Sequence, residues 1–208
     1  TKYSLLNRIR LFIAKFTLPQ SQVIRVVSNK IADSLVMRGY DKDKIIVKPI
    51  DVNIDYIKDA KPAFNLHEKF PQFGKIILMV SRLESEKNIE MAIDALSLAK
   101  AKIPNLGLLI VGSGTKLNSL KDRASKLKME SNIAFVGWQT DLIPYYKGCD
   151  LFLTTSWYEG YGMTLVEAKA AGCKIVSTDI GVADEVGAAI VDWNPERIAE
   201  KIQGILIT

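Results

Sequence analysis

The sequence predicts an α/β fold in which a parallel sheet is flanked by helices. From residue 75 onward, short apolar runs alternate with helical segments, which is the pattern of βαβ units. The runs are continuously apolar, as expected for strands that helices cover on both faces. Glycines and basic residues collect directly after these runs, at the carboxyl ends of the predicted strands. Open parallel sheets bind their ligands at that rim.

Length and composition fit a folded domain with a fragment of a second one. The chain has 208 residues, of which 48% are hydrophobic and 25% are charged. Its net charge of +5 is spread along the sequence, which does not favour nucleic acid as a partner. No apolar run approaches the length of a membrane span. The chain begins with Thr1 rather than Met, so we expect it to be part of something longer.

The cysteine and histidine content limits the possible chemistry. Cys149 and Cys173 have no metal-ligand spacing and are expected to be buried thiols, which favours a reducing, cytoplasmic compartment. His67 is the only histidine, so a His-based triad or a multi-His metal site is excluded within this chain.

Residues 1–50 are predicted to be a remnant of another domain. Residues 2–18 form a basic amphipathic helix that either packs on that domain or lies on a membrane surface. Ser28 is a plausible N-cap for a following helix. The other predicted elements are a strand at 22–27, a helix at 29–38 and a strand at 45–47.

Residues 51–74 have no clear period and are predicted to be an interdomain linker, and residues 75–208 to be the main domain. Asn88 is expected to cap the first helix of that domain. The predicted strands are 76–80, 108–111, 133–136, 151–154, 174–177 and 188–191. The predicted helices are 89–103, 117–127, 141–148, 163–172 and a last one from Pro195.

The residues after the strands suit an anionic, hydroxylated ligand. Arg82 and Lys87 follow the predicted strand at 76–80, and such cations can hold a diphosphate. The segment 112–114, Gly-Ser-Gly, is a tight turn that lacks the third glycine of a dinucleotide fingerprint. Glu159 and Glu167 bracket a glycine-rich turn that leads into a helix, whose N-terminus favours phosphate. Ionised carboxylates accept hydrogen bonds, so each can hold a pair of hydroxyls.

Together these blocks resemble one family. The E-x7-E motif from Glu159 to Glu167, with the blocks at 81–83, 87–88, 112–114, 135–137 and 168–178, resembles the C-terminal, donor-binding half of GT-B retaining glycosyltransferases of family four. The resemblance covers about residues 75–208 and implies a Rossmann-like domain. Residues 23–50 resemble the end of the N-terminal, acceptor-binding half.

The resemblance implies a role for each matching residue. Arg82 and Lys87 match the pair that holds the donor diphosphate and stabilises its departure, and Glu159 matches the acid that binds hydroxyls of the transferred sugar. Glu167 matches the acid that holds the ribose. Other donor-binding positions are implied at Gly112, Gly137, Trp138, Gly160, Tyr161, Gly162, Met163 and Thr164. The resemblance implies retaining transfer of a hexose from a UDP- or GDP-sugar to a glycan or lipid-linked acceptor, with neither a metal nor a cofactor.

The chain also departs from the family pattern. Residues 180–185 replace a Gly-Gly-x-Pro-Glu block, and the stretch 186–189 is shortened. Most of the acceptor half is missing, together with its Gly-rich loop and a His that His67 does not match. We therefore expect the isolated chain to bind donor but to show little transferase activity.

Other interpretations stay open. The chain can be a truncated, catalytically inactive module that binds a nucleotide-sugar. An epimerase of the same two-domain fold would be expected to carry a different set of acids. A dehydrogenase is disfavoured by the incomplete dinucleotide fingerprint.

Overall fold

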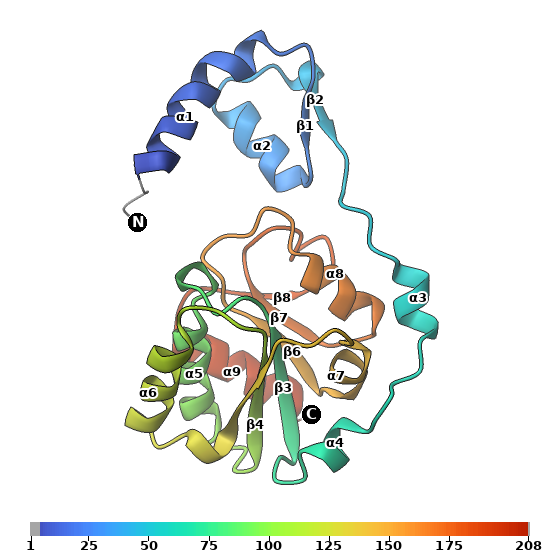
Figure 1. The fold of residues 1–208 in the computed structure, drawn as a ribbon, viewed down its shortest axis with the longest axis vertical. Coiled ribbons are helices and arrows are strands. Elements are labelled where there is room, and N and C mark those ends of the chain that lie inside the picture. Colours follow the sequence, from blue (N-terminus) through green and yellow to red (C-terminus); the bar gives the residue numbers. More distant parts are fainter. Residues whose placement is uncertain (1–4, 208) are drawn as a thin grey trace. The chain divides into compact units, whose positions relative to one another are not determined.

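The chain divides into two compact units, Thr1–Ile50 and Asp51–Thr208 (Figure 1). The computed structural model describes residues 5–207, so residues 2–4 of the predicted first helix lie outside the described residues. Among the helices of residues 5–207, none has the length and apolar character needed to cross a membrane.

The first unit is a strand–helix–strand segment preceded by a helix. Its helices are α1 (Leu5–Thr17) and α2 (Asn29–Met37), and its strands are β1 (Ile24–Val26) and β2 (Ile45–Val47). The two strands pair in parallel, with Ile24 beside Ile45. Ser28 caps α2 as predicted, since its Oγ accepts a hydrogen bond from the backbone N–H of Ile31 at 3.4 Å.

The second unit contains a six-stranded, all-parallel sheet in the order β5-β4-β3-β6-β7-β8, which confirms the predicted α/β fold. The strands are β3 (Lys75–Val80), β4 (Leu106–Val111), β5 (Ile133–Gly137), β6 (Leu151–Thr154), β7 (Ile175–Thr178) and β8 (Ala189–Val191). The helices are α3 (Ile54–Asp59), α4 (Leu66–Lys69), α5 (Ile89–Ala99), α6 (Leu117–Lys126), α7 (Ile143–Gly148), α8 (Met163–Ala170) and α9 (Pro195–Leu206).

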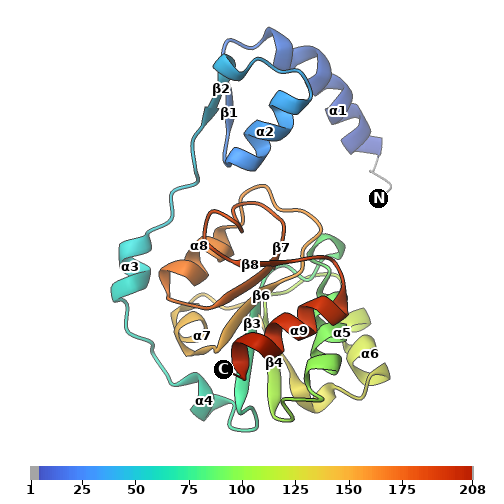
Figure 2. The ribbon, with the colours of Figure 1, turned by 180° about the vertical axis from the view of Figure 1, so that it is seen from behind.

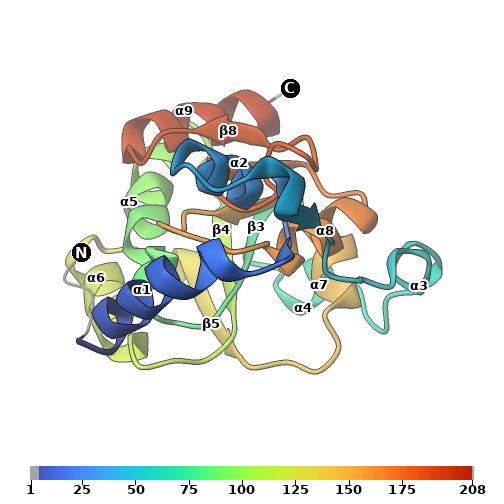
Figure 3. The ribbon, with the colours of Figure 1, turned by 90° about the horizontal axis from the view of Figure 1, so that it is seen from above.

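Helices cover both faces of the sheet, which explains the continuously apolar strands. Along β3, Ile77 and Met79 belong to the core under α5, α6 and α9. The alternate residues Ile76 and Leu78 belong to the core under α4, α7 and α8. All four side chains are at most 2% exposed. Figures 2 and 3 show α9 lying beside α5, with which it is in contact.

The segment before β3 contains helices that the sequence did not lead us to expect. The segment 51–74, predicted as a linker without a period, contains α3 and α4, which contact α8 and α7. Asn53 and Asn65 cap these helices with their side chains and were the signal available in the sequence. Asn88 occupies the N-cap position of α5, but its side chain does not cap the helix as predicted. It adopts a left-handed conformation with φ of 49°, and its amide donates to Met91 Sδ instead.

The cysteines also differ from the prediction. Cys149 and Cys173 are half-buried rather than fully buried, and both are free thiols. They follow α7 and α8 and precede the neighbouring strands β6 and β7, which brings their Sγ atoms to 3.7 Å. Both thiols donate to the backbone carbonyl of Tyr146, at 3.4 and 3.0 Å. Spacing along the sequence did not reveal this proximity because it depends on the pairing of two strands.

Candidate functional site

The chain reverses its order in the sheet between β3 and β6, and two loops meet at the carboxyl ends of these strands. An open parallel sheet forms its ligand-binding crevice at such a position. The loop after β6 is joined to the loop after β3 by a hydrogen bond from Thr155 Oγ1 to the carbonyl of Asn88 at 2.9 Å. A second joins the N–H of Trp157 to the carbonyl of Glu86 at 2.8 Å.

A cavity of about 170 Å³ lies at this crevice and brings together predicted site residues from four elements. Arg82 follows β3, Gly112 follows β4, Trp138 follows β5, and Thr164 lies in the first turn of α8. Two larger hollows, of about 600 and 480 Å³, contain none of the predicted site residues. The cavity is also lined by Val80, Ser81, Val111, Ser113, Gln139 and Leu142.

The wall of the cavity requires a glycine at position 112. Gly112 has φ of 137°, and a Cβ there would lie 1.9 Å from the carbonyl oxygen of Ser81. Its N–H donates to the carbonyl of Gly137 at 2.8 Å. A shift in the pairing of β4 with β5 sets Val111 beside Gly137, and this irregularity brings the two glycines together. Two predicted donor-binding glycines are therefore hydrogen-bonded to each other.

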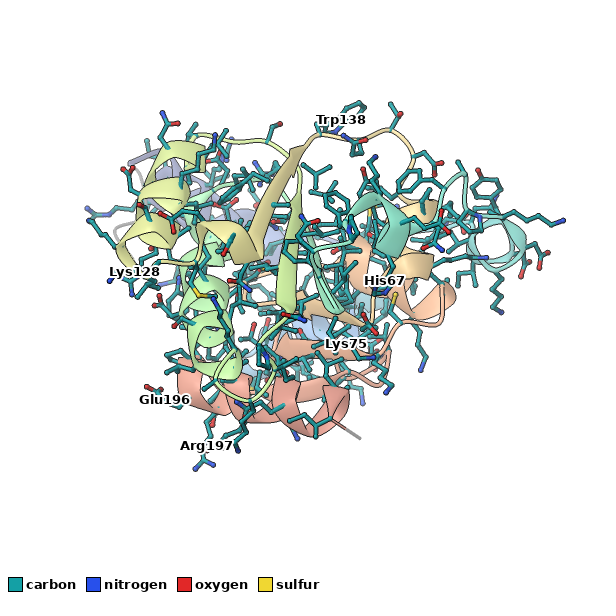
Figure 4. The ribbon with its side chains drawn as sticks, turned by 90° about the horizontal axis from the view of Figure 1, so that it is seen from below. His67, Lys75, Lys128, Trp138, Glu196 and Arg197 are labelled. Carbon is teal, nitrogen blue, oxygen red and sulfur yellow. The ribbon has the colours of Figure 1, made fainter. Side chains whose placement is uncertain are left out.

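Trp138 and the only histidine of the chain lie at different ends of the strands. Trp138 is 68% exposed and projects from the loop after β5 (Figure 4). His67 and Lys75 lie together near the amino ends of the strands, where both contact Asp150. Their distances to its carboxylate oxygens are 3.3 and 2.9 Å. His67 is therefore remote from the crevice.

Both predicted diphosphate-binding cations are paired with acidic side chains. Lys87 Nζ lies 2.6 Å from Glu159 Oε1, and the two side chains are only 12% and 20% exposed. Ser156 Oγ donates to the same carboxylate oxygen at 3.0 Å. Arg82 pairs with Glu86 at 2.8 Å, where the side chains are 72% and 43% exposed. Lys87 and Glu159 were predicted to contact different parts of the ligand, and the structure places them in contact with each other.

The glycine-rich turn at residues 160–162 places the N-terminus of helix α8 at the crevice. Gly162 precedes the helix with φ of 92°, and no side chain among the described residues caps it. The first amides of α8, beginning at Met163, are therefore free of a side-chain cap. Gly160 and Tyr161 lie in the turn, and the carbonyl of Tyr161 accepts from the N–H of Val182 at 2.9 Å. The segment 180–185, which departs from the family pattern, therefore contacts this turn through a backbone hydrogen bond.

Glu167 lies one turn into α8 and contacts a residue to which the sequence analysis gave no role. Tyr146, on α7, donates its hydroxyl to Glu167 Oε2 at 2.7 Å. Burial, followed by the nearby charge of Glu167, raises the pKa of Tyr146 well above its usual value. The tyrosine therefore stays a hydrogen-bond donor at neutral pH. No local pattern pointed to this contact, because it joins two helices.

Ser81 is a second residue without a predicted role. Its Oγ is buried against the cavity and has no hydrogen-bond partner among the described residues. A buried hydroxyl normally has a partner, so this group is available to a ligand. Its position between the end of β3 and Arg82 was the signal available in the sequence. Within residues 5–207, no group of three His, Cys, Asp or Glu side chains is placed to hold a metal ion.

Comparison with known proteins identifies a matching family and several relatives. Residues 63–207 match the profile of the family described as glycosyl transferases group 1. The chain is 34% identical over 123 residues to mannosylfructose-phosphate synthase of Agrobacterium fabrum, covering 54% of this chain and 27% of the relative. It is 25% identical over 207 residues to D-inositol 3-phosphate glycosyltransferase of Segniliparus rotundus, covering 90% and 46%.

A solved structure shows the same fold. The crystal structure of HepE from Anabaena in complex with UDP and glucose superposes with a TM-score of 0.82 at 20% identity. The match covers 98% of this chain and 58% of HepE. The chain thus spans about a quarter to a half of the two curated relatives and somewhat more than half of this structural neighbour.

Proposed function

The chain belongs to the family of glycosyl transferases group 1, and from this premise we propose that its second unit binds a nucleoside-diphosphate sugar as a transferase donor. The convergence of strand ends on one crevice carries the proposal. Arg82, Gly112 and Thr164, in the first turn of α8, line one cavity. Lys87 and Glu159, which do not line it, come from the loops after β3 and β6 and pair with each other. Cations, backbone amides and hydroxyl-binding carboxylates are the groups that such a donor needs.

We propose that Arg82 and Lys87 bind the diphosphate of the donor. Glu159 binds hydroxyls of the sugar, and Glu167 binds the ribose. Gly137 and Trp138 border the base. A cavity of about 170 Å³ is too small for a whole nucleotide-sugar, because small-molecule sites usually measure about 300–1,000 Å³. The rest of the donor would therefore lie outside this cavity, and the bound sugar would be presented to an acceptor-binding half of the full protein.

We infer that the transfer is of the retaining, metal-independent kind of family four. Cleavage of the sugar–diphosphate bond places negative charge on the leaving group. Arg82, Lys87 and the uncapped amides at the start of α8 supply positive potential for that charge without a metal ion. The proposed donor is a UDP- or GDP-hexose, and the bound UDP of HepE supports the uridine choice. The acceptor is a glycan or a lipid-linked glycan, and the compartment is the cytoplasm.

A panel of UDP, GDP, ADP and their hexose derivatives tests the proposal by thermal shift. We expect one diphosphate to raise the melting temperature of the 208-residue chain, because a ligand that binds only the folded state stabilises it. The isolated chain is expected to transfer little sugar to any glycan acceptor. Absence of a shift with every nucleotide contradicts the proposal. The alternative, an inactive nucleotide-sugar-binding module, predicts that adding an acceptor-binding half also restores no turnover.

The Lys87–Glu159 pair predicts opposite effects of one substitution on two ligands. In Glu159→Gln, Lys87 is released from its anionic partner, so a bare nucleoside diphosphate should bind about three- to tenfold more tightly, roughly 1 kcal/mol. The additional affinity given by the sugar should fall, because the carboxylate that accepts from its hydroxyls is gone. Isothermal titration calorimetry with UDP and UDP-glucose measures both effects.

Glu86→Gln is the matched control for this prediction. It releases Arg82 in the same way, but the Arg82–Glu86 pair is exposed and should contribute little. We expect UDP affinity to change by less than about twofold. Weaker UDP binding by Glu159→Gln would contradict the proposed competition between Glu159 and the diphosphate for Lys87.

The exposed apolar side chains of α1 support a second proposed contact. Ile9, Phe12, Ile13 and Phe16 are 47–65% exposed in the described residues, and basic residues Arg8, Arg10 and Lys15 lie on the same helix. This surface either packs on the acceptor-binding half or lies on a membrane.

Co-sedimentation with vesicles that contain anionic lipid distinguishes these two uses of α1. Membrane binding should be lost when Arg8, Arg10 and Lys15 are all replaced by Glu, since each basic residue contributes about 1 kcal/mol near an anionic surface. Binding that is unaffected by this reversal, or absent in the unaltered chain, would instead support packing on the acceptor-binding half.

A further inference from the structure

We propose that Tyr146 is a positioning residue, which orients the Glu167 carboxylate toward the ribose of the bound donor. The inference rests on the proposed function, because it gives Glu167 the ribose. Its basis is the 2.7 Å hydrogen bond from the Tyr146 hydroxyl to Glu167 Oε2. This contact links α7 to α8 behind the candidate site.

The two residues lie one helical turn behind the cavity. Leu142, at the start of α7, and Thr164, in the first turn of α8, both line the cavity. Tyr146 follows Leu142 by four residues, and Glu167 follows Thr164 by three. Residues at these spacings share a helix face. The Tyr146–Glu167 bond therefore stands directly behind two residues of the cavity wall.

The bond occupies one carboxylate oxygen and leaves the other available. Among the described residues, no second hydrogen bond to the Glu167 carboxylate is present. A carboxylate with one oxygen fixed by a donor presents the other in a defined direction. Neighbouring ribose hydroxyls need such an acceptor at a fixed place, and preorganised groups bind without a further ordering cost.

Tyr146 is itself held firmly enough to position another group. It is 2% exposed, and its ring lies 5.7 Å from that of Phe152 between centroids. Its N–H donates to the carbonyl of Leu142 at 3.0 Å. Its own carbonyl accepts from the thiols of Cys149 and Cys173. Both thiols thus contact the backbone of the residue that orients Glu167.

A purely structural role for this bond makes a different prediction. Loss of a buried hydrogen bond lowers stability and would weaken every ligand alike. A positioning role weakens only the recognition of the ribose hydroxyls. The two roles can therefore be separated by comparing UDP with 2′,3′-dideoxy-UDP, which lacks those hydroxyls and keeps the base and the diphosphate.

The test is isothermal titration calorimetry of both nucleotides with the full 208-residue chain. Tyr146→Phe should lower the UDP to dideoxy-UDP affinity ratio about fivefold, as expected for residues coupled in one network. Glu167→Gln should lower the ratio at least as far, and the double variant no further. Tyr145→Phe is the matched control, because it removes a neighbouring buried hydroxyl that has no partner in the described part of the chain. It should leave the ratio unchanged.

Each result decides one question. An unchanged ratio in Tyr146→Phe, or equal losses for both nucleotides, overturns the positioning role while the proposed function stands. An unaltered ratio in Glu167→Gln overturns the assignment of Glu167 to the ribose and the role of Tyr146 with it. Failure of the unaltered chain to bind UDP, GDP or ADP overturns the proposed function itself.

Discussion

Replacing Arg82 by alanine is expected to weaken the binding of every nucleoside diphosphate by about 10- to 100-fold. A guanidinium can donate two hydrogen bonds to phosphate oxygens, and hydrogen bonds to charged groups contribute about 1.5–3 kcal/mol. Arg82 follows β3 and lines the cavity, while its partner Glu86 lies later in the same loop and does not line the cavity. The ion pair is exposed, so its loss should hardly change stability. Calorimetric titration with UDP, GDP and ADP measures the effect.

Arg197→Ala is the control for this substitution. Arg197 is also an exposed arginine in an ion pair with a nearby acid, Glu200, but it lies on α9 and does not line the cavity. We expect it to bind UDP as the unaltered chain does, within about twofold. Equal affinity losses in the two variants would indicate a non-specific charge effect, and an unaffected Arg82→Ala would remove Arg82 from the diphosphate site.

The sheet could be predicted because its signals are local. The strand at 76–80 is a continuous apolar run, and the structure extends it by one residue to Lys75. Glycine and basic residues after such runs indicated the ligand-binding rim, since all parallel strands end on the same side. Arg82, Gly112 and Trp138 come from three separate strand ends, and they do line one cavity.

The remaining features depend on contacts between distant segments. Lys87 and Glu159 are 72 residues apart, and their ion pair forms only because β3 and β6 are neighbours in the sheet. The hydrogen bond of Tyr146 with Glu167 joins two helices in the same way. The side-chain cap predicted at Asn88 is wrong for a local reason. Asn is a common capping residue, but it also tolerates the left-handed conformation that this position has.

Gly112→Ala is expected to have the largest effect on stability. The new Cβ would lie 1.9 Å from the carbonyl oxygen of Ser81, which is backbone and cannot rotate away. The backbone at Gly112 also has a φ of 137°, which side chains rarely allow. Steric strain of this kind should cost about 2–4 kcal/mol. The melting temperature should fall by roughly 5–15 °C in a unit of this size, as measured by differential scanning calorimetry. UDP binding should fall too, because Ser81 and Gly112 both line the cavity.

Gly137→Ala separates steric collision from backbone conformation. Gly137 also has a positive φ, of 80°, but a Cβ there meets no atom within 4 Å. Its substitution therefore costs only the conformational term, about 1–2 kcal/mol. The difference in stability loss between the two variants therefore gives the cost of the collision between a Cβ at position 112 and the backbone of Ser81. If both variants lost the same stability, the contact between Ser81 and Gly112 could not be a determinant of the cavity wall.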